Sequence, residues 1–300
     1  MRARSSPQIT LGLVARAAGD VDAALHHFRA ATARDRADLW SAYDAAETLR
    51  ALGRDEEADA ALRALAGGTP LPHALRALGA AARARGNAEE ALAALRVAAD
   101  LLPADPWFLL DHAEALVALE RLDEADVALR ALAQRHPRFA GARRALMRLA
   151  TRRGDAATRL DEARALAALD PDAGALDLAD VLLDRGEQAE AETVCVRHLA
   201  RRGPTPRPLR QLARAARQIG DPERALAHLR AAARLLPADA TLRAECAGEA
   251  LALGRVAQAK ADAEAALAID PTAPRAHRIL ALVARASCRS GRGVGPRRAR

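Results

Sequence analysis

The sequence is poor in aromatic residues and in the residues that form disulfides and amide-rich binding sites. Aromatic side chains make up 2% of its 300 residues, and it has three cysteines, a single lysine (Lys260) and a single asparagine (Asn87). Because 51% of the residues are nevertheless apolar, closely packed helices are favoured over a sheet-rich fold. The cysteines, at positions 195, 246 and 288, are an odd number without paired spacing, which indicates neither a disulfide framework nor a zinc site.

The chain also lacks the motifs of common enzyme classes. It has no His-Glu-x-x-His, no phosphate-binding loop and no Gly-x-Ser-x-Gly, and its 8 histidines are scattered. We therefore expect no catalytic residue, no cofactor, no metal and no small-molecule substrate. No apolar run approaches the ~20 residues of a membrane-spanning helix, and Arg16 interrupts the first apolar segment, which favours a helix over a signal peptide. These features predict a cytoplasmic protein.

The net charge of +7 is located at the two ends of the chain. The terminal segments hold seven arginines and no acid: Arg2, Arg4, Arg289, Arg292, Arg297, Arg298 and Arg300. The other basic residues, 46 minus 7, equal the 39 acidic ones, so the body is neutral and no nucleic-acid partner is expected. Every basic residue except Lys260 is an arginine, a bias typical of a GC-rich bacterial genome.

In place of motifs the sequence has a repeat of about 34 residues. Glycine, or glutamate in one copy, recurs at 19, 53, 86, 120, 154, 186, 220 and 254, with separations of 34, 33, 34, 34, 32, 34 and 34 residues. Proline usually follows seventeen residues later, as Pro237 follows Gly220. Glycine ends a first helix in a left-handed backbone and proline stops a second helix, so each copy predicts two helices.

Small residues recur on both helices of the repeat. The recurring glycine, or Glu120 in the fourth copy, is called the anchor of its repeat. The residue seven positions before the anchor is glycine or alanine in every copy except the fifth, where it is Met147. The residue five positions after the anchor is alanine in every copy except the fifth, where it is Arg159. Two helices joined by a tight turn can cross closely only where both side chains are no larger than a methyl group. The fifth copy has both departures and is followed by the short 32-residue interval, so we expect it to form the weakest interface.

This pattern resembles the tetratricopeptide repeat family, whose period is 34 residues. The resemblance implies an all-α fold, a right-handed α-solenoid of helix-turn-helix repeats. We expect eight repeats over 5–273, a capping helix over 274–288, and a disordered arginine- and glycine-rich tail over 289–300. In the capping helix we expect His277, Leu280 and Ala284 on the inner face.

In that family, ligands usually lie in a concave groove lined by first helices. One candidate region holds the only tyrosine and one of the two tryptophans beside acids, in the second repeat: Trp40, Tyr43, Asp44 and Glu47. A second candidate is formed by arginines of the fifth and seventh repeats, at helical intervals: Arg144, Arg148, Arg210, Arg214 and Arg217. For the aromatic residues, packing between repeats remains an alternative.

Three aspartates of the sixth repeat, Asp177, Asp180 and Asp184, lie between the two arginine sets in sequence. With Arg152 and Arg207 included, seven arginines face these three acids, so about four guanidinium groups are expected to remain unpaired and to attract an acidic segment. The alternative is an ion-pair ladder with a purely structural role. Clamps for a C-terminal carboxylate use lysine and asparagine on first helices, and this chain has neither there.

We interpret the sequence as a non-catalytic protein-protein interaction scaffold that binds a peptide or helix of another protein in its groove. The alternative is the recruiting arm of a larger, truncated glycan-modifying or glycosyltransferase enzyme. The change in composition after about residue 288 also resembles out-of-frame translation, which would fit that alternative.

Overall fold

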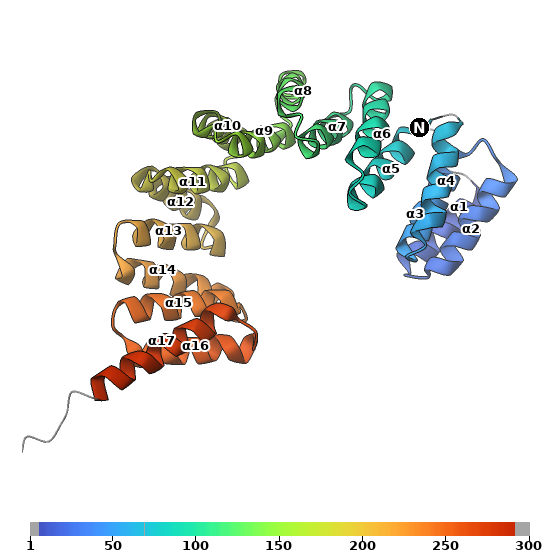
Figure 1. The fold of residues 1–300 in the computed structure, drawn as a ribbon. Coiled ribbons are helices and arrows are strands. Elements are labelled where there is room, and N and C mark those ends of the chain that lie inside the picture. The colour runs from blue at the N-terminus through green and yellow to red at the C-terminus, as the bar shows by residue number, and fades with distance from the viewer. Residues whose placement is uncertain (1–5, 69, 292–300) are drawn as a thin grey trace, which may run out of the picture. The chain divides into compact units, whose positions relative to one another are not determined.

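A computed structural model describes residues 6–68 and 70–291. Contacts divide the chain into two compact units, Met1–Leu149 and Ala150–Arg300, with the boundary inside a helix of the fifth repeat. The described residues form seventeen helices and no strand (Figure 1): α1 (Pro7–Ala17), α2 (Val21–Arg34), α3 (Leu39–Ala51), α4 (Asp55–Gly67), α5 (Pro72–Ala84), α6 (Ala88–Leu101), α7 (Pro106–Ala118), α8 (Leu122–Arg135), α9 (Ala140–Arg153), α10 (Ala156–Leu169), α11 (Ala173–Arg185), α12 (Gln188–Arg202), α13 (Pro206–Gln218), α14 (Pro222–Leu235), α15 (Ala240–Ala252), α16 (Val256–Ile269) and α17 (Pro274–Gly291).

The all-α repeat fold predicted from the sequence is confirmed. Odd-numbered helices are the first helices of the repeats and even-numbered helices are the second. Within each unit, consecutive helices pack against one another in chain order, and α11 also contacts α13 while α15 contacts α17. First helices of neighbouring repeats therefore come close enough for their side chains to interact.

The turn between the two helices of a repeat uses a left-handed residue. The seven anchor glycines have φ between 70° and 81°. In the fourth repeat Glu120 occupies this position with a φ of 57°, and it is the one non-glycine residue with a positive φ in the described part of the chain. The Cβ atom of any residue other than glycine makes this backbone region unfavourable, so Glu120 holds a strained conformation.

Close approach of the two helices depends on small residues, as the sequence predicted. A Cβ added to Gly12 would lie 2.7 Å from Cε1 of Phe28, and one added to Gly79 would lie 2.5 Å from Cγ of Leu95. The alanines at the matching positions of other first helices are fully buried: Ala46, Ala113, Ala179, Ala213 and Ala247, each 0% exposed. Methyl groups thus set the distance between paired helices.

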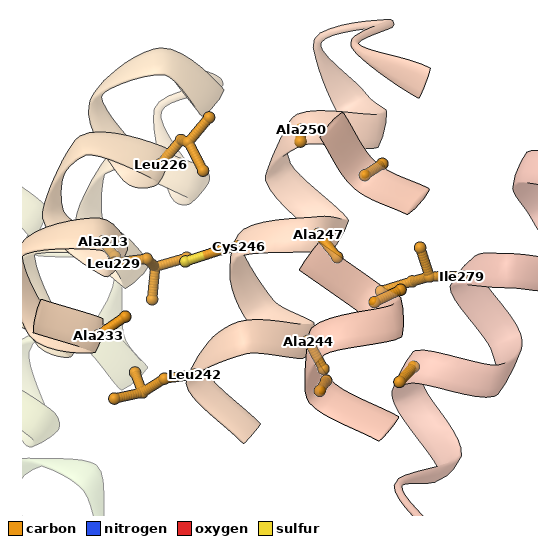
Figure 2. Close-up of a cluster of buried hydrophobic side chains, with 14 of the residues drawn as sticks. Ala213, Leu226, Leu229, Ala233, Leu242, Ala244, Cys246, Ala247, Ala250 and Ile279 are labelled. Atoms are coloured by element: carbon orange, nitrogen blue, oxygen red, sulfur yellow. The ribbon is translucent and has the colours of Figure 1, made fainter. Parts of the chain in front are cut away.

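The core of the second unit is built mainly from alanine and leucine of α13 to α17. Figure 2 shows Leu226 and Leu229 facing Cys246 and the alanines of α15, with Ile279 of α17 on the far side. Burial raises the pKa of the Cys246 thiol to about 11 and that of Cys195 to about 12, so both thiols stay protonated at neutral pH. The two cysteines serve as small core residues.

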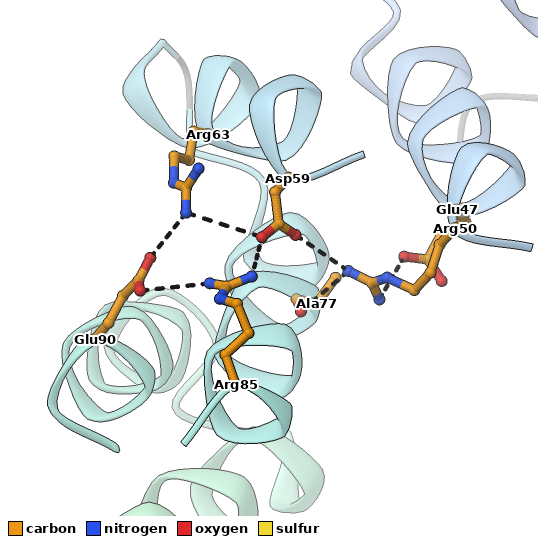
Figure 3. Close-up of polar contacts among 7 residues, drawn as sticks. All are labelled: Glu47, Arg50, Asp59, Arg63, Ala77, Arg85 and Glu90. Carbon is orange, nitrogen blue, oxygen red and sulfur yellow. Dashed lines mark hydrogen bonds and ion pairs between the residues drawn. The ribbon is translucent and has the colours of Figure 1, made fainter. Parts of the chain in front are cut away.

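A polar cluster centred on Asp59 joins three helices of the first unit (Figure 3). Asp59 is 6% exposed and is paired with Arg85 at the end of α5, with Arg50 of α3 at 4.0 Å and with Arg63 of its own helix at 3.9 Å. Arg50 also donates to the carbonyl oxygen of Ala77 at 3.4 Å. Three guanidinium groups therefore compensate one buried carboxylate.

The helix α17 covers the last repeat, but with a different face from the one predicted. Ala276, Ile279 and Val283 are buried, whereas His277 and Ala284 are exposed, and Leu280 is only partly buried. The prediction was wrong for His277 and Ala284, because residues spaced by three and four from Ala276 form the contact stripe and each of the two lies one residue, about 100°, away from it. Residues 289–291 belong to the helix, and the rest of the predicted tail, 292–300, lies outside the described residues.

Among the helices that the structure describes, none combines the length and the apolar character that crossing a membrane would require.

Replacing Glu120 by glycine is expected to stabilise the chain by about 1 kcal/mol, because glycine adopts a positive φ without steric cost. Urea unfolding followed by circular dichroism measures the change. The control is Glu120→Ala, which removes the charge but keeps Cβ. An equal gain in both variants would assign the effect to the charge and not to the backbone.

Replacing Ile279 by alanine is expected to lower the free energy of unfolding by about 2 kcal/mol, because the buried side chain leaves a cavity under α17. Leu282, which is 45% exposed on the same helix, provides the control, and its replacement by alanine is expected to cost under about 1 kcal/mol. Equal losses in thermal melts would show that α17 does not cap the core through this face.

Candidate functional site

The helix α13 separates its apolar and basic residues onto two faces. Leu209, Leu212, Ala213 and Ala216 are buried, because they repeat at intervals of three and four and pack onto the neighbouring helices. Four arginines follow the same spacing on another face and are 30–47% exposed: Arg207, Arg210, Arg214 and Arg217. The periodicity that builds the core therefore also aligns the cations.

Two of these arginines reach back to the preceding first helix, α11. Nη2 of Arg207 donates to Oδ1 of Asp177 at 2.7 Å and to Oδ2 of Asp180 at 2.9 Å. Nη2 of Arg214 donates to Oδ1 of Asp184 at 2.6 Å. The ion-pair ladder, which was the alternative interpretation of the sequence, is therefore present between α11 and α13 in the second unit.

The other two reach forward to α15. Nη2 of Arg210 donates to Oε1 of Glu245 at 2.6 Å. Nε of Arg217 donates to Oε1 of Glu249 at 2.6 Å, and its Nη2 donates to Oε2 of Glu245 at 3.2 Å. Both glutamate side chains are only 9% exposed, so these pairs are much less hydrated than the pairs with α11.

The expectation of about four unpaired guanidinium groups is therefore wrong for α13. The count omitted Glu245 and Glu249, which stand 35 residues after Arg210 and 32 residues after Arg217, about one repeat later. An acid one period away from a base on a first helix is the signal that sequence reasoning missed.

A hollow of about 450 Å³ lies over this surface of the second unit. It is lined by charged residues of α11, α13 and α15 together with Gln211 and Pro206: Asp180, Arg207, Arg210, Arg214, Arg217 and Glu245. Gln211 is fixed beneath the arginines, because its Nε2 donates to the carbonyl oxygen of Leu176 at 2.7 Å. Gln211 thus holds the floor of the hollow to α11, and the arginines form the walls.

The aspartate at the end of this surface, Asp184, is stabilised as a carboxylate. Burial alone would raise the pKa of Asp184, but hydrogen bonds from Arg214 and from Arg159, the latter at 2.6 Å, hold this pKa below its ordinary value. Arg159, which departs from the small-residue pattern, therefore has a polar role within the second unit.

The arginines predicted on α9 belong to the first unit. Nη2 of Arg148 donates to Oε1 of Glu114 on α7 at 2.5 Å, and Arg83 of α5 lies 3.5 Å from the same carboxylate. Arg144 is half-buried. That Arg144 and Arg148 share one groove with the arginines of α13 stays a prediction.

The aromatic candidates lie in a chain of ring contacts between repeats of the first unit. The ring of Trp40 on α3 is 4.7 Å from that of His73 on α5, which is 5.3 Å from that of Phe108 on α7. Tyr43 lies 6.0 Å from Trp40 at a right angle. These contacts match packing between repeats, while Trp40 keeps 37% of its surface exposed.

The acids of this region have partners within the first unit. Asp44 is 5% exposed and its Oδ1 accepts from Nη1 of Arg16 at 3.2 Å, and Glu47 is paired with Arg50 at 3.2 Å. Burial, with the charges of Glu47 and Asp44, raises the pKa of Tyr43, so its phenol remains protonated. A role in binding for Trp40, Tyr43, Asp44 and Glu47 stays a prediction.

Comparison with known proteins found similarity only at the level of structure. No family model matches the sequence, and no curated protein matches it. Yeast Tom70 superposes with a TM-score of 0.61 at 14% identity, covering 96% of this chain and 65% of Tom70.

Two bacterial repeat proteins are also similar. The C-terminal part of a TPR repeat-containing protein from Cytophaga hutchinsonii gives a TM-score of 0.60 at 16% identity, over 79% of this chain and 99% of that one. A tetratricopeptide repeat protein from Parabacteroides merdae gives 0.53 at 16% identity, over 92% and 97%. With its 34-residue period and its helix pairs, the chain has the fold of tetratricopeptide repeat proteins.

Proposed function

We propose that the chain is a non-catalytic interaction scaffold that holds an acidic segment of another protein against first helices, with the hollow over α13 as its main contact surface. The observation that carries this proposal is the row of four half-exposed arginines lining a hollow of about 450 Å³. Guanidinium groups bind carboxylates through two parallel hydrogen bonds, so such a row recognises acids at intervals along a segment.

The two kinds of ion pair on α13 suggest different roles. Arg207 and Arg214 are paired with partly exposed aspartates, whose side chains are 19–41% exposed. An incoming carboxylate can replace these partners at little cost, because the displaced aspartates are already partly hydrated. Arg210 and Arg217 instead compensate the buried Glu245 and Glu249, and removing them would leave buried charges without partners.

A guanidinium group carries five N–H donors. In the contacts described above, Arg207 and Arg214 each use Nη2, and 47% and 41% of their side-chain surfaces remain exposed. The remaining donors can bind main-chain carbonyl or carboxylate oxygens of a bound segment without breaking the ladder. A recruiting arm of an enzyme would use the same surface, so the same test applies to that alternative.

We expect the double variant Arg207→Gln/Arg214→Gln to lose at least about tenfold in affinity for a partner, because a lost charge-assisted hydrogen bond contributes about 1.5–3 kcal/mol. Partners are first captured from an extract of the native host and identified by mass spectrometry. Affinity is then measured by fluorescence anisotropy with an acidic peptide of the captured protein, at two salt concentrations.

The matched control is Arg197→Gln/Arg234→Gln, which removes two exposed arginines from second helices of the same unit. It is expected to bind like the original chain. If this control and the Arg207→Gln/Arg214→Gln variant bind the partner equally well, α13 is not the contact surface. Circular dichroism should show unchanged folding in both, because Asp184 keeps its hydrogen bond from Arg159.

A further inference from the structure

A second hollow, of about 790 Å³, lies in the first unit between the second helices α2 and α4 and over the first helix α3. Its walls are α2 and α4 and its floor is α3. Each wall contributes residues at intervals of three and four, Arg29 to Arg36 from one side and Glu57 to Gly68 from the other. At a rise of about 1.5 Å per residue, the walls extend over roughly 10 Å and 16 Å.

The hollow is apolar along its length. Leu39 and Leu49 lie in the floor, and α4 presents Ala60, Ala61 and Ala64. These alanines leave the space that longer side chains of a second helix would fill. A bound helix could therefore approach α4 closely, because its alanines are as small as the residues that let the two helices of one repeat approach each other.

Two departures from the repeat pattern border this same hollow. Arg36 stands where most repeats have proline, and Gly68 stands where the other second helices end in leucine, isoleucine or arginine. A Cβ added to Gly68 would find only the carbonyl oxygen of Ala64, at 3.8 Å, in its neighbourhood. One departure thus opens the end of the groove, and the other places a cation there.

The two arginines of the hollow differ in their pairing. Arg29 is 3.5 Å from Glu57 across the groove, and it shares this carboxylate with Arg54, whose Nε and Nη2 donate to Glu57 at 2.6 and 2.7 Å. Arg36 is exposed and has no acidic partner within 4.0 Å among the described residues. The adjacent carboxylates of Asp35 and Asp38 accept hydrogen bonds from the backbone amides of Ala37 and Trp40. The rim of the groove therefore holds one exposed guanidinium group that forms no ion pair with the described residues.

We propose that this groove binds an amphipathic helix of a partner protein, about three turns long, with an apolar stripe toward Leu39 and Leu49 and a carboxylate that pairs with Arg36. Its length fits the two walls, and its apolar stripe fits the alanines and leucines. An acidic residue of the partner can pair with Arg36, because this guanidinium group is exposed and forms no ion pair within 4.0 Å among the described residues. This surface is separate from the hollow over α13, so its function does not depend on the proposed role of α13.

The test uses the full chain and a display library of 14-residue amphipathic helical peptides, with acidic, basic and neutral residues varied beside a fixed apolar stripe. Peptides enriched by the chain are expected to carry an acid near one end. Ala64→Gln is expected to weaken their binding at least about tenfold by filling the groove. Arg36→Gln should weaken it about three- to tenfold, and Arg36→Lys should restore most of it.

Matched controls separate the groove from the rest of the surface. Ala131 stands eleven residues after its anchor in the fourth repeat, as Ala64 does in the second, and is exposed. Arg34 is an exposed arginine of α2 outside the hollow. Ala131→Gln and Arg34→Gln are expected to leave binding unchanged.

The proposal would be overturned by the absence of any enriched peptide, by equal effects of Ala64→Gln and Ala131→Gln, or by enrichment of basic peptides. Concentration-dependent dimerisation of the chain that Ala64→Gln abolishes would instead assign the groove to a second copy of this chain. Loss of peptide binding in Arg207→Gln/Arg214→Gln but not in Ala64→Gln would place the peptides on α13 and also contradict this inference.

Discussion

The contact of methyl-sized residues between paired helices is the constraint on which the rest of this structure depends. A Cβ on Gly12 or Gly79 would overlap the facing Phe28 or Leu95, and the corresponding alanines of other repeats are completely buried. Because the helix pairs are held this close, large residues such as Phe28, Leu95 and Leu229 fill the remaining space, and a chain with 2% aromatic residues still builds a dense core. The polar surfaces are arranged on the framework that this contact sets.

Electrostatics follows the repeat period. Arg214 and Asp184 are 30 residues apart, Arg210 and Glu245 are 35 apart, and Arg148 and Glu114 are 34 apart, so each pair joins first helices of neighbouring repeats. The pairs differ in hydration: the aspartates of α11 are partly exposed, whereas Glu245 and Glu249 are nearly buried. One row of arginines can therefore combine structural support with a surface that exchanges its partners.

The fold could be predicted almost completely, because glycine turns, small contact residues and a fixed period each leave a mark on single positions of the sequence. The candidate sites could not. Pairing of Arg210 and Arg217 depends on acids one repeat away, and a count restricted to α11 missed them. The inner face of α17 was placed one residue off, because Ala276, Ile279 and Val283 are buried in place of His277, Leu280 and Ala284. The groove between α2 and α4 exists because residues such as Gly68 are small. A search of the sequence for charged or reactive residues does not find such positions.

The alternation of partners along α13 has a consequence for how such an array can change over evolutionary time. Repeat proteins gain and lose whole repeats by recombination, and uncharged interfaces would tolerate any order of the repeats. Here, loss of the seventh repeat, residues 206–239, would bring α15 next to α11. The side chains of Glu245 and Glu249 would then face those of three aspartates, Asp177, Asp180 and Asp184. Five acids would then lie close together without the four arginines of α13, and only Asp184 would keep its hydrogen bond from Arg159. The charges on the first helix of each repeat thus restrict which repeats can lie next to it in the array.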